Sequence, residues 1–256
     1  MENIIYMSNE GVSTISINRP KAYNALDVQT LNELLETIKI IKENDDKMVI
    51  LTGEGPAFSA GGDINMMTEI TSVEDFGEMM DVITELTLEL YLLPKLVISA
   101  INGSAAGLGL SLALNSDYII AEEKAEFGVL FAGIGLIPDG GGHFHLEERL
   151  GSHKAKQFIW GMEKVKGEDA QNMGLADIIT NKRAVIEAND LTKRLKHAPL
   201  LAMIESKQLL HQAKKGKLLA YLEAEKQSQI KMAQTDDHKE GVRAFLNKEM
   251  PKFKSK

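Results

Sequence analysis

The chain has 256 residues, of which 44% are hydrophobic and 26% are charged, and it contains no cysteine. These values exclude a disordered chain, a collagen-like repeat and a small disulfide-bonded scaffold. With 37 acidic against 29 basic residues the formal net charge is -8, which argues against a protein that binds nucleic acid mainly through phosphate contacts.

The chain opens with MENIIYMSNEG, which lacks the basic and apolar regions of a signal peptide. No later apolar run reaches the roughly 20 residues that a membrane-spanning helix needs. We therefore expect a cytoplasmic protein that interacts with neither a membrane nor a nucleic acid.

The first half of the chain is expected to alternate strands with helices. Residues 4–6 and 12–17 form a predicted hairpin around a Gly11 turn. Asp27 is the expected N-cap of a helix, because apolar residues follow it at helical spacing, namely Val28, Leu31, Leu34, Leu35, Ile38 and Ile41. Continuously apolar runs predict buried strands at 48–51, 97–101 and 118–121. This alternation is typical of an α/β fold.

The second half becomes helical. Helices are predicted over 152–160 and 168–173, the latter ended by Gly174, before a short strand at 177–180. Beyond residue 181 the sequence predicts three helices, at 183–196, 200–214 and 217–247, and no strand. We therefore divide the chain into a core over 1–181, which holds the site, and a C-terminal helical region over 182–256.

Three segments rich in small residues are the candidates for chemistry. Residues 57–64 directly follow a buried strand, where small residues let a ligand approach the backbone. Residues 101–109 lead from a strand into a helix start, whose free N–H groups can hold negative charge. Residues 133–142 place Asp139 among glycines and apolar residues, which favours a raised carboxyl pKa and acid–base chemistry. Taken singly, each segment also has a structural explanation, as tight helix-on-sheet packing or as a turn.

Other site classes find little support. None of the three segments is a phosphate loop, a nucleophile elbow or a dinucleotide fingerprint. His143 and His145 lack the spacing of metal ligands, so we predict no metal site, with His143 either packed or lining a pocket near Asp139. The remaining histidines are expected to be solvated, and these are His153, His197, His211 and His238. Trp160 is expected in the core or a subunit interface, and Asp63 is expected to brace its loop.

In order along the chain, several motifs together resemble the enoyl-CoA hydratase/isomerase family, also called the crotonase superfamily. They are Asn18-Arg19-Pro20 with Asn24-Ala25-Leu26, Phe58-Ser59-Ala60-Gly61-Gly62-Asp63-Ile64, Asn102-Gly103 with Gly107 and Gly109, Asp117, Ala125-Glu126-Phe127-Gly128 and Gly135-Leu136-Ile137-Pro138. The resemblance implies an α/β spiral of ββα repeats whose C-terminal helical region mediates assembly into a homotrimer or a dimer of trimers. It implies an acyl-CoA thioester as substrate and no separate cofactor, since coenzyme A belongs to the substrate.

The resemblance also implies roles for individual residues. The backbone N–H groups of Ala60 and Leu108 match the family's oxyanion hole, in which each donor is typically worth about 3 to 4 kcal/mol. Further residues match the substrate and CoA pocket, and they are Lys21, Ala22, Leu26, Ala60, Gly61, Gly62, Asp63, Ile64, Gly107 and Phe131. Phe253 and Lys256, in the basic tail, match residues that reach the CoA of a neighbouring subunit.

The chain departs from the hydratase pattern at two positions. Family hydratases activate water with two glutamates, whose positions are occupied here by Ser111 and Phe131. The remaining carboxylate, Asp139, follows Ile137-Pro138, as in the isomerases of phenylacetate degradation. The sequence therefore predicts an acyl-CoA isomerase in which Asp139 moves a proton between two carbons of a dienolate held by the oxyanion hole.

Alternatives remain open at this point. The chain could be a hydratase that lacks the usual glutamate pair, a non-catalytic acyl-CoA binding protein or, more remotely, a dehalogenase with Asp139 as nucleophile. RNA binding is supported only by three lysines of the tail, Lys252, Lys254 and Lys256. The stretch over 65–93 contains four methionines, Met66, Met67, Met79 and Met80. They belong either to the core or to the wall of an acyl pocket.

Overall fold

The computed structural model describes residues 2–69 and 72–256, with the side chains of 67–69 left aside, so the prediction for Met67 lies outside the described residues. Its larger sheet has six strands in the order β1-β2-β3-β5-β7-β10. These are β1 (Ile4–Asn9), β2 (Val12–Ile17), β3 (Met48–Gly53), β5 (Leu96–Ile101), β7 (Tyr118–Glu122) and β10 (Ile178–Thr180). The β1–β2 pair is antiparallel, as the predicted hairpin requires, and the other pairs are parallel.

A second sheet consists of three-residue strands that the sequence analysis did not identify. These are β4 (Ala57–Ser59), β6 (Ser104–Ala106), β8 (Glu126–Gly128) and β9 (Lys164–Lys166), in that order in the sheet. Each of β4, β6 and β8 follows a strand of the larger sheet after a short loop and precedes a helix. The predicted spiral of ββα repeats is thereby confirmed.

Helices enclose the two sheets. They are α1 (Val28–Glu43), α2 (Ile64–Glu69), α3 (Val73–Tyr91), α4 (Leu108–Leu114), α5 (Gly142–Gly161) and α6 (Gly167–Met173), with 3-10 turns η1 (Pro20–Ala22) and η2 (Phe131–Ile134). Asp27 caps α1 as predicted, since its side chain accepts from the Thr30 N–H at 2.8 Å. Helix α5 begins at Gly142, ten residues before the predicted start at 152. The prediction missed the first half because Gly151, which has a non-helical φ of 74°, interrupts the helical spacing of apolar residues within α5.

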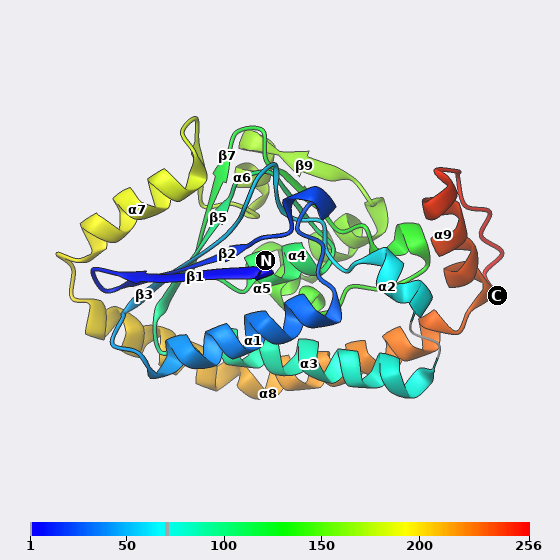
Figure 1. Ribbon diagram of the computed structural model, residues 1–256, viewed down its shortest axis with the longest axis horizontal. Coiled ribbons are helices and arrows are strands. Elements are labelled where there is room, and N and C mark those ends of the chain that lie inside the picture. The colour runs from blue at the N-terminus through cyan, green and yellow to red at the C-terminus, as the bar shows by residue number, and fades with distance from the viewer. Residues whose placement is uncertain (1, 70–71) are drawn as a thin grey trace.

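Three helices complete the chain: α7 (Ala184–Leu195), α8 (Leu200–Ala233) and α9 (Asp236–Asn247). The predicted break near 215–216 is wrong, because α8 continues through Gly216. It lies beside α3, which in turn lies beside α1 (Figure 1). Contacts along α3 outweigh the roughly 1 kcal/mol that an interior glycine costs a helix. The break falls instead at Thr235, whose hydroxyl accepts from the His238 N–H and caps α9.

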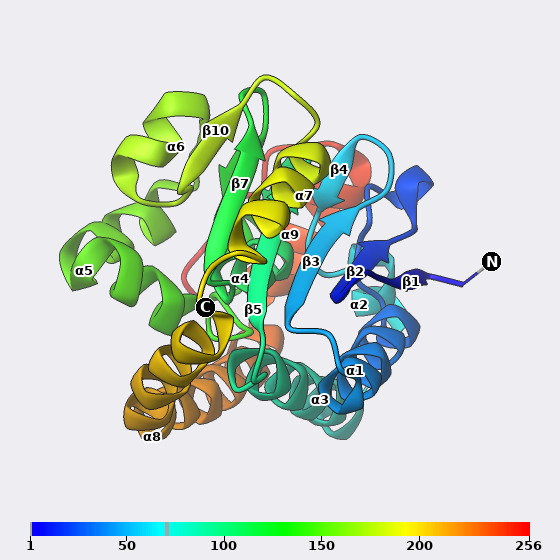
Figure 2. The same cartoon turned by 90° about the vertical axis from the view of Figure 1, so that its left-hand side faces the viewer.

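The helical region shares its core with the larger sheet. Helix α7 covers one face of that sheet (Figure 2), where it packs against Met48 and Ile50. Val49 and Leu51, which alternate with them along β3, face the main core. This alternation follows from the two-residue period of a strand. Helix α9 lies at the opposite end of the molecule from α7 (Figure 1), against η2. No helix within the described residues is long and apolar enough to span a membrane.

Some side chains are not placed as expected. His238 is buried with its Nδ1 2.8 Å from the Ile134 carbonyl oxygen, and half-buried His211 stacks on the Tyr91 ring, so the prediction that both are solvated is wrong. Both lie on helix faces that pack against other parts of the chain. Trp160 exposes 67% of its surface and therefore does not belong to the core of this chain. Its place in a subunit interface stays a prediction.

Candidate active site

A cavity of about 930 Å³ opens where the three small-residue segments meet beside the second sheet. Of the residues proposed from the sequence, its wall contains Ala22, Ala60, Gly62, Asp63, Ile64, Gly107, Phe131 and Asp139. Lys21, Leu26, Gly61, Leu108, Phe253 and Lys256 are not among its lining residues. Helix-on-sheet packing alone therefore does not account for the small residues, because they also border a cavity large enough for a ligand.

The first segment runs from β4 into α2 through a bridge to Leu26. The Leu26 N–H donates to the Gly61 carbonyl at 2.8 Å, and the Asp63 N–H donates to the Leu26 carbonyl at 3.0 Å. In such a parallel bridge the intervening residue, Gly62, directs its own N–H and carbonyl away from Leu26. The Ala60 N–H, in contrast, donates to the Tyr23 carbonyl at 2.9 Å. The expectation that Ala60 supplies a free donor thus disagrees with the geometry.

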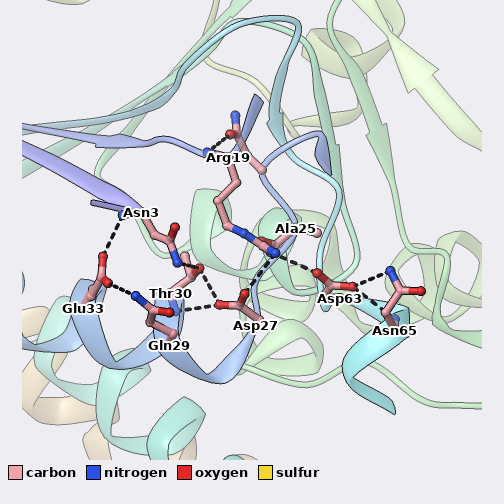
Figure 3. Close-up of polar contacts among 10 residues, drawn as sticks. Asn3, Arg19, Ala25, Asp27, Gln29, Thr30, Glu33, Asp63 and Asn65 are labelled. Atoms are coloured by element: carbon pink, nitrogen blue, oxygen red, sulfur yellow. Dashed lines mark hydrogen bonds and ion pairs between the residues drawn. The ribbon is translucent and has the colours of Figure 1, made fainter. Parts of the chain in front are cut away.

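Asp63 is held by its neighbours at the end of this segment, as Figure 3 shows. Its Oδ2 lies 3.0 Å from Arg19 Nη1, and its Oδ1 accepts from the Asn65 backbone N–H at 3.1 Å. Arg19 also pairs with Asp27 at 3.0 Å. The arginine thereby ties the start of α2 to the start of α1, and Asp63 braces the loop.

The second segment ends at the start of α4. Gly107 has φ 53° and ψ -131°, a conformation open only to glycine, and α4 begins at the next residue, Leu108. A Cβ on Gly61 would lie 3.2 Å from the Leu108 nitrogen and 2.7 Å from the Ala106 carbonyl oxygen. The first two segments are therefore in direct contact. Across the part of the chain that the structure describes, neither the Gly62 nor the Leu108 N–H has a protein acceptor.

The third segment carries the carboxyl group of Asp139 into a buried position. The residue is 5% exposed, and its Oδ2 accepts from Gln229 Nε2 at 3.1 Å. Its Oδ1 has no hydrogen-bond partner among the described residues. Burial, with the nearby negative charge of Glu225, raises the pKa of Asp139 to about 8. At neutral pH this carboxyl group is mostly protonated.

Two residues beside Asp139 escaped the sequence analysis. Glu225 and Gln229 come from α8, and Gln229 follows Asp139 by 90 residues in sequence. With Leu218 and Leu222 they form the buried face of that part of α8, at helical spacing. The sequence signal that could have identified them is that Glu225 and Gln229 continue the apolar stripe of Leu218 and Leu222, where polar residues are not expected. His143 is half-buried and contacts Glu225 at 2.8 Å, and it is not among the residues that line the cavity.

The C-terminal part of the same chain borders the cavity through α9. Phe245 and Leu246 line it, as do Met162, Lys124 and Lys164 near the β8–β9 pair. The tail folds back on the start of α9, where the N–H groups of Asp236 and Asp237 donate to the Lys256 main-chain oxygen at 3.1 and 3.3 Å. The role expected for the tail at a neighbouring subunit stays a prediction. Within 2–69 and 72–256 no cluster of three or more His, Cys, Asp or Glu side chains could hold a metal ion.

Comparison with known proteins agrees with this geometry. The family described as enoyl-CoA hydratase/isomerase matches residues 7–256. YhaR of Bacillus subtilis (strain 168), provisionally named an enoyl-CoA hydratase/isomerase, is 44% identical, with 100% of both chains covered. The 1,2-epoxyphenylacetyl-CoA isomerase of Escherichia coli (strain K12) is 32% identical, also over 100% of both chains. The structure of an enoyl-CoA hydratase from Mycobacterium avium subsp. paratuberculosis K-10 has a TM-score of 0.90 at 27% identity, with 99% of each chain covered. The chain belongs to the enoyl-CoA hydratase/isomerase family.

Proposed function

We propose that this protein is an acyl-CoA isomerase that shifts the double bond of an unsaturated acyl-CoA thioester, with Asp139 as its acid–base group. The observation that carries the proposal is the buried Asp139 carboxyl on the cavity wall, with one oxygen held by Gln229 and the other unpartnered. Burial raises its pKa to about 8. Such a value suits a group that must both accept and return a proton near neutral pH.

The thioester oxygen is proposed to accept hydrogen bonds from the N–H groups of Gly62 and Leu108. These N–H groups have no protein acceptor among the described residues, and the segments that carry them touch at Gly61. The Ala60 N–H is engaged by Tyr23. We therefore move the first donor from Ala60 to Gly62. Donors in this arrangement stabilise the negative charge that develops on the oxygen as the α-carbon region loses a proton.

The proton transfer needs one carboxylate and no activated water. Ionised Asp139 takes a proton from one end of the allylic unit, and the electron pair moves into a dienolate whose negative charge rests on the thioester oxygen. The protonated carboxyl then returns the proton at the other end, and the double bond moves. No group leaves and no atom is added.

Hydration is less well supported, because no second carboxylate among the described residues of the wall is free to activate water. The family's glutamate positions hold Ser111 and Phe131. Asp63 is paired with Arg19, and Glu126 at the mouth is paired with Lys164 at 2.9 Å. Glu225 is nearby but does not line the cavity, and both of its oxygens accept hydrogen bonds from the loop behind Asp139.

The proposal also includes the expected isomerase type, cellular location, lack of a cofactor and assembly. The E. coli 1,2-epoxyphenylacetyl-CoA isomerase supports the resemblance to the phenylacetate type, at 32% identity. We also propose that the protein acts in the cytoplasm without a separate cofactor, and that it assembles as a homotrimer or a dimer of trimers through its C-terminal helical region.

The test is incubation of the purified protein with 3-enoyl-CoA and 2-enoyl-CoA in deuterated water, with products followed by mass and ultraviolet absorption. We expect interconversion with deuterium uptake. Asp139→Asn should lower kcat at least about 100-fold with KM nearly unchanged. The exposed Asp169→Asn on α6 is the matched control and should keep full activity.

Other outcomes would replace the proposal. Formation of 3-hydroxyacyl-CoA would identify a hydratase without the usual glutamates. Saturable acyl-CoA binding without deuterium uptake would identify a binding protein, and full turnover by Asp139→Asn would remove Asp139 as the acid–base group.

A further inference from the structure

Behind the cavity, one face of α8 holds the loop that carries Asp139. Glu225 and Gln229 are 2% and 1% exposed, respectively, and lie four residues apart, so both point to the same side of the helix. Glu225 accepts from the Gly141 N–H at 2.8 Å, from the His143 N–H at 3.0 Å and faces His143 Nδ1 at 2.8 Å. Gln229 accepts a longer hydrogen bond of 3.4 Å from the Ile137 N–H and donates to Asp139. One helix face therefore contacts both ends of the loop.

The loop needs such support because its own residues provide little. Three consecutive glycines, 140–142, follow Asp139, and Gly140 and Gly141 have φ values of 60° and 75°. Glycines lack side chains that could fix the conformation by packing, and they have the greatest backbone freedom. Without external hydrogen bonds, the orientation of the Asp139 carboxyl would not be defined.

Burying a glutamate and a glutamine on this face of α8 costs folding free energy. A carboxylate and an amide removed from water destabilise the fold unless their hydrogen bonds are made. Leucines at 218 and 222 fill the preceding turns of the same face, so apolar residues would pack there. Because these two polar residues engage the Asp139 loop specifically, their cost points to a role at the site.

We propose that Gln229 and Glu225 are positioning residues for Asp139: Gln229 holds Oδ2 so that Oδ1 is the oxygen that transfers the proton, and Glu225 anchors the glycine loop. The proposal rests on the isomerase function argued above and names two residues that act through Asp139. Neither residue lines the cavity. Both therefore act without touching the substrate.

The two residues affect the acidity of Asp139 in opposite directions. The Gln229 hydrogen bond stabilises the carboxylate and lowers its pKa, whereas the negative charge of Glu225 raises it. The other titratable groups that face the loop are His143 and His145 from α5, and burial lowers the pKa of His145 to about 3 and keeps it neutral. The elements on the other side place Ile83, Leu108 and Ser111 against the loop, and none of these side chains titrates in this range.

The experiment is an infrared titration of the Asp139 carboxyl in the full-length protein without substrate. The carbonyl band of the protonated Asp139 carboxyl is assigned by its absence from the spectrum of Asp139→Asn. Because an imidazole has no carboxyl group, titration of His143 does not produce such a band. Gln229→Met keeps the volume but removes the hydrogen bond, and we expect it to raise the pKa of Asp139. Glu225→Gln removes the charge, and we expect it to lower that pKa. Each shift should be about one unit.

The control is Gln208→Met, which removes a glutamine of the same helix whose amide donates to the Leu92 and Leu93 carbonyls away from the cavity. It should leave the Asp139 titration unchanged. If Gln229→Met does not fold, Gln229→Asn takes its place, because it withdraws the amide by one methylene and should shift the titration in the same direction. Thermal unfolding checks that each variant is folded.

Kinetics supply the second readout. Gln229→Met should lower kcat about 10- to 100-fold with KM within about twofold, because a misoriented carboxyl loses rate and not affinity. An unchanged titration in either variant, or shifts of the same sign, would overturn the positioning pair. Absence of isomerisation by the wild-type protein would instead defeat the proposed function, and the infrared titration would still decide whether α8 positions Asp139.

Discussion

The two halves of the site are held in different ways. The proposed backbone donors, Gly62 and Leu108, are held by local contacts of the spiral core, through the bridge to Leu26 and the close approach at Gly61. The proposed acid–base group, Asp139, lies in a glycine-rich loop that is held by side chains of α8, more than 80 residues away in sequence. The first half thus depends on the absence of side chains, and the second depends on two particular side chains. Substitutions should therefore affect the two halves differently.

The largest effect is expected from Gly61→Ala, which tests the backbone half. The residue has φ 92°, and the added Cβ would lie 2.7 Å from the Ala106 carbonyl oxygen. Separating the first two segments should misplace both donors and lower kcat/KM more than about 100-fold. Gly216→Ala, at an exposed position of α8, is the control, because no atom lies within 4 Å of its added Cβ. Equal activity in both alanine variants would contradict the described arrangement.

The next prediction concerns the pH dependence of turnover, which belongs to the carboxyl half. Asp139 must be ionised to take a proton, and its pKa is raised to about 8. The wild-type kcat/KM for 3-enoyl-CoA should therefore fall about tenfold for each pH unit below about 8 and level off above it. A profile that is flat from pH 6 to 9 would show that no group with this pKa limits the reaction.

The same raised pKa predicts a smaller effect on stability. The folded-state pKa of Asp139, about 8, exceeds the ordinary aspartate pKa of 3.8, which applies to the unfolded chain. Between these values the folded state therefore binds more protons than the unfolded state. Stability attributable to this group therefore decreases as pH rises through that window. Asp139→Asn should unfold at a temperature several degrees above that of the wild type at pH 8, with little difference at pH 4. An advantage that does not grow with pH would argue against a strained ionised carboxyl.

The smallest effect is expected from Arg19→Met, which loosens the backbone half from outside the cavity. It removes the pairs with Asp27 and Asp63, both partly exposed. The expected loss is about 1 to 2 kcal/mol of unfolding free energy in urea, with a KM increase of a few-fold. Arg183→Met, at an exposed position before α7, should change neither quantity. A large loss of kcat in Arg19→Met would mean that this brace affects the chemistry directly.

The sequence was informative where the signal lies in adjacent residues. The N-cap at Asp27, the buried strands and the hairpin depend on periodicity and turn residues within a few positions, and the structure agrees with these predictions. The three-residue strands of the second sheet were not found, because so short a segment has no period of its own. The first half of α5 was missed because Gly151 interrupts its helical spacing. Gly216 wrongly suggested the end of a helix, because packing against α3 stabilises α8 through that position.

By itself, the sequence determined the alternation of strands and helices, the three small-residue segments and the single carboxyl of the third segment, because these are properties of local composition and spacing. Only the tertiary structure decided that the Ala60 N–H is engaged by Tyr23 while Gly62 directs its N–H away from Leu26. It likewise decided that Glu225 and Gln229 surround Asp139. Hydrogen-bond partners and burial depend on which distant segments meet, and no local pattern of residues contains that information.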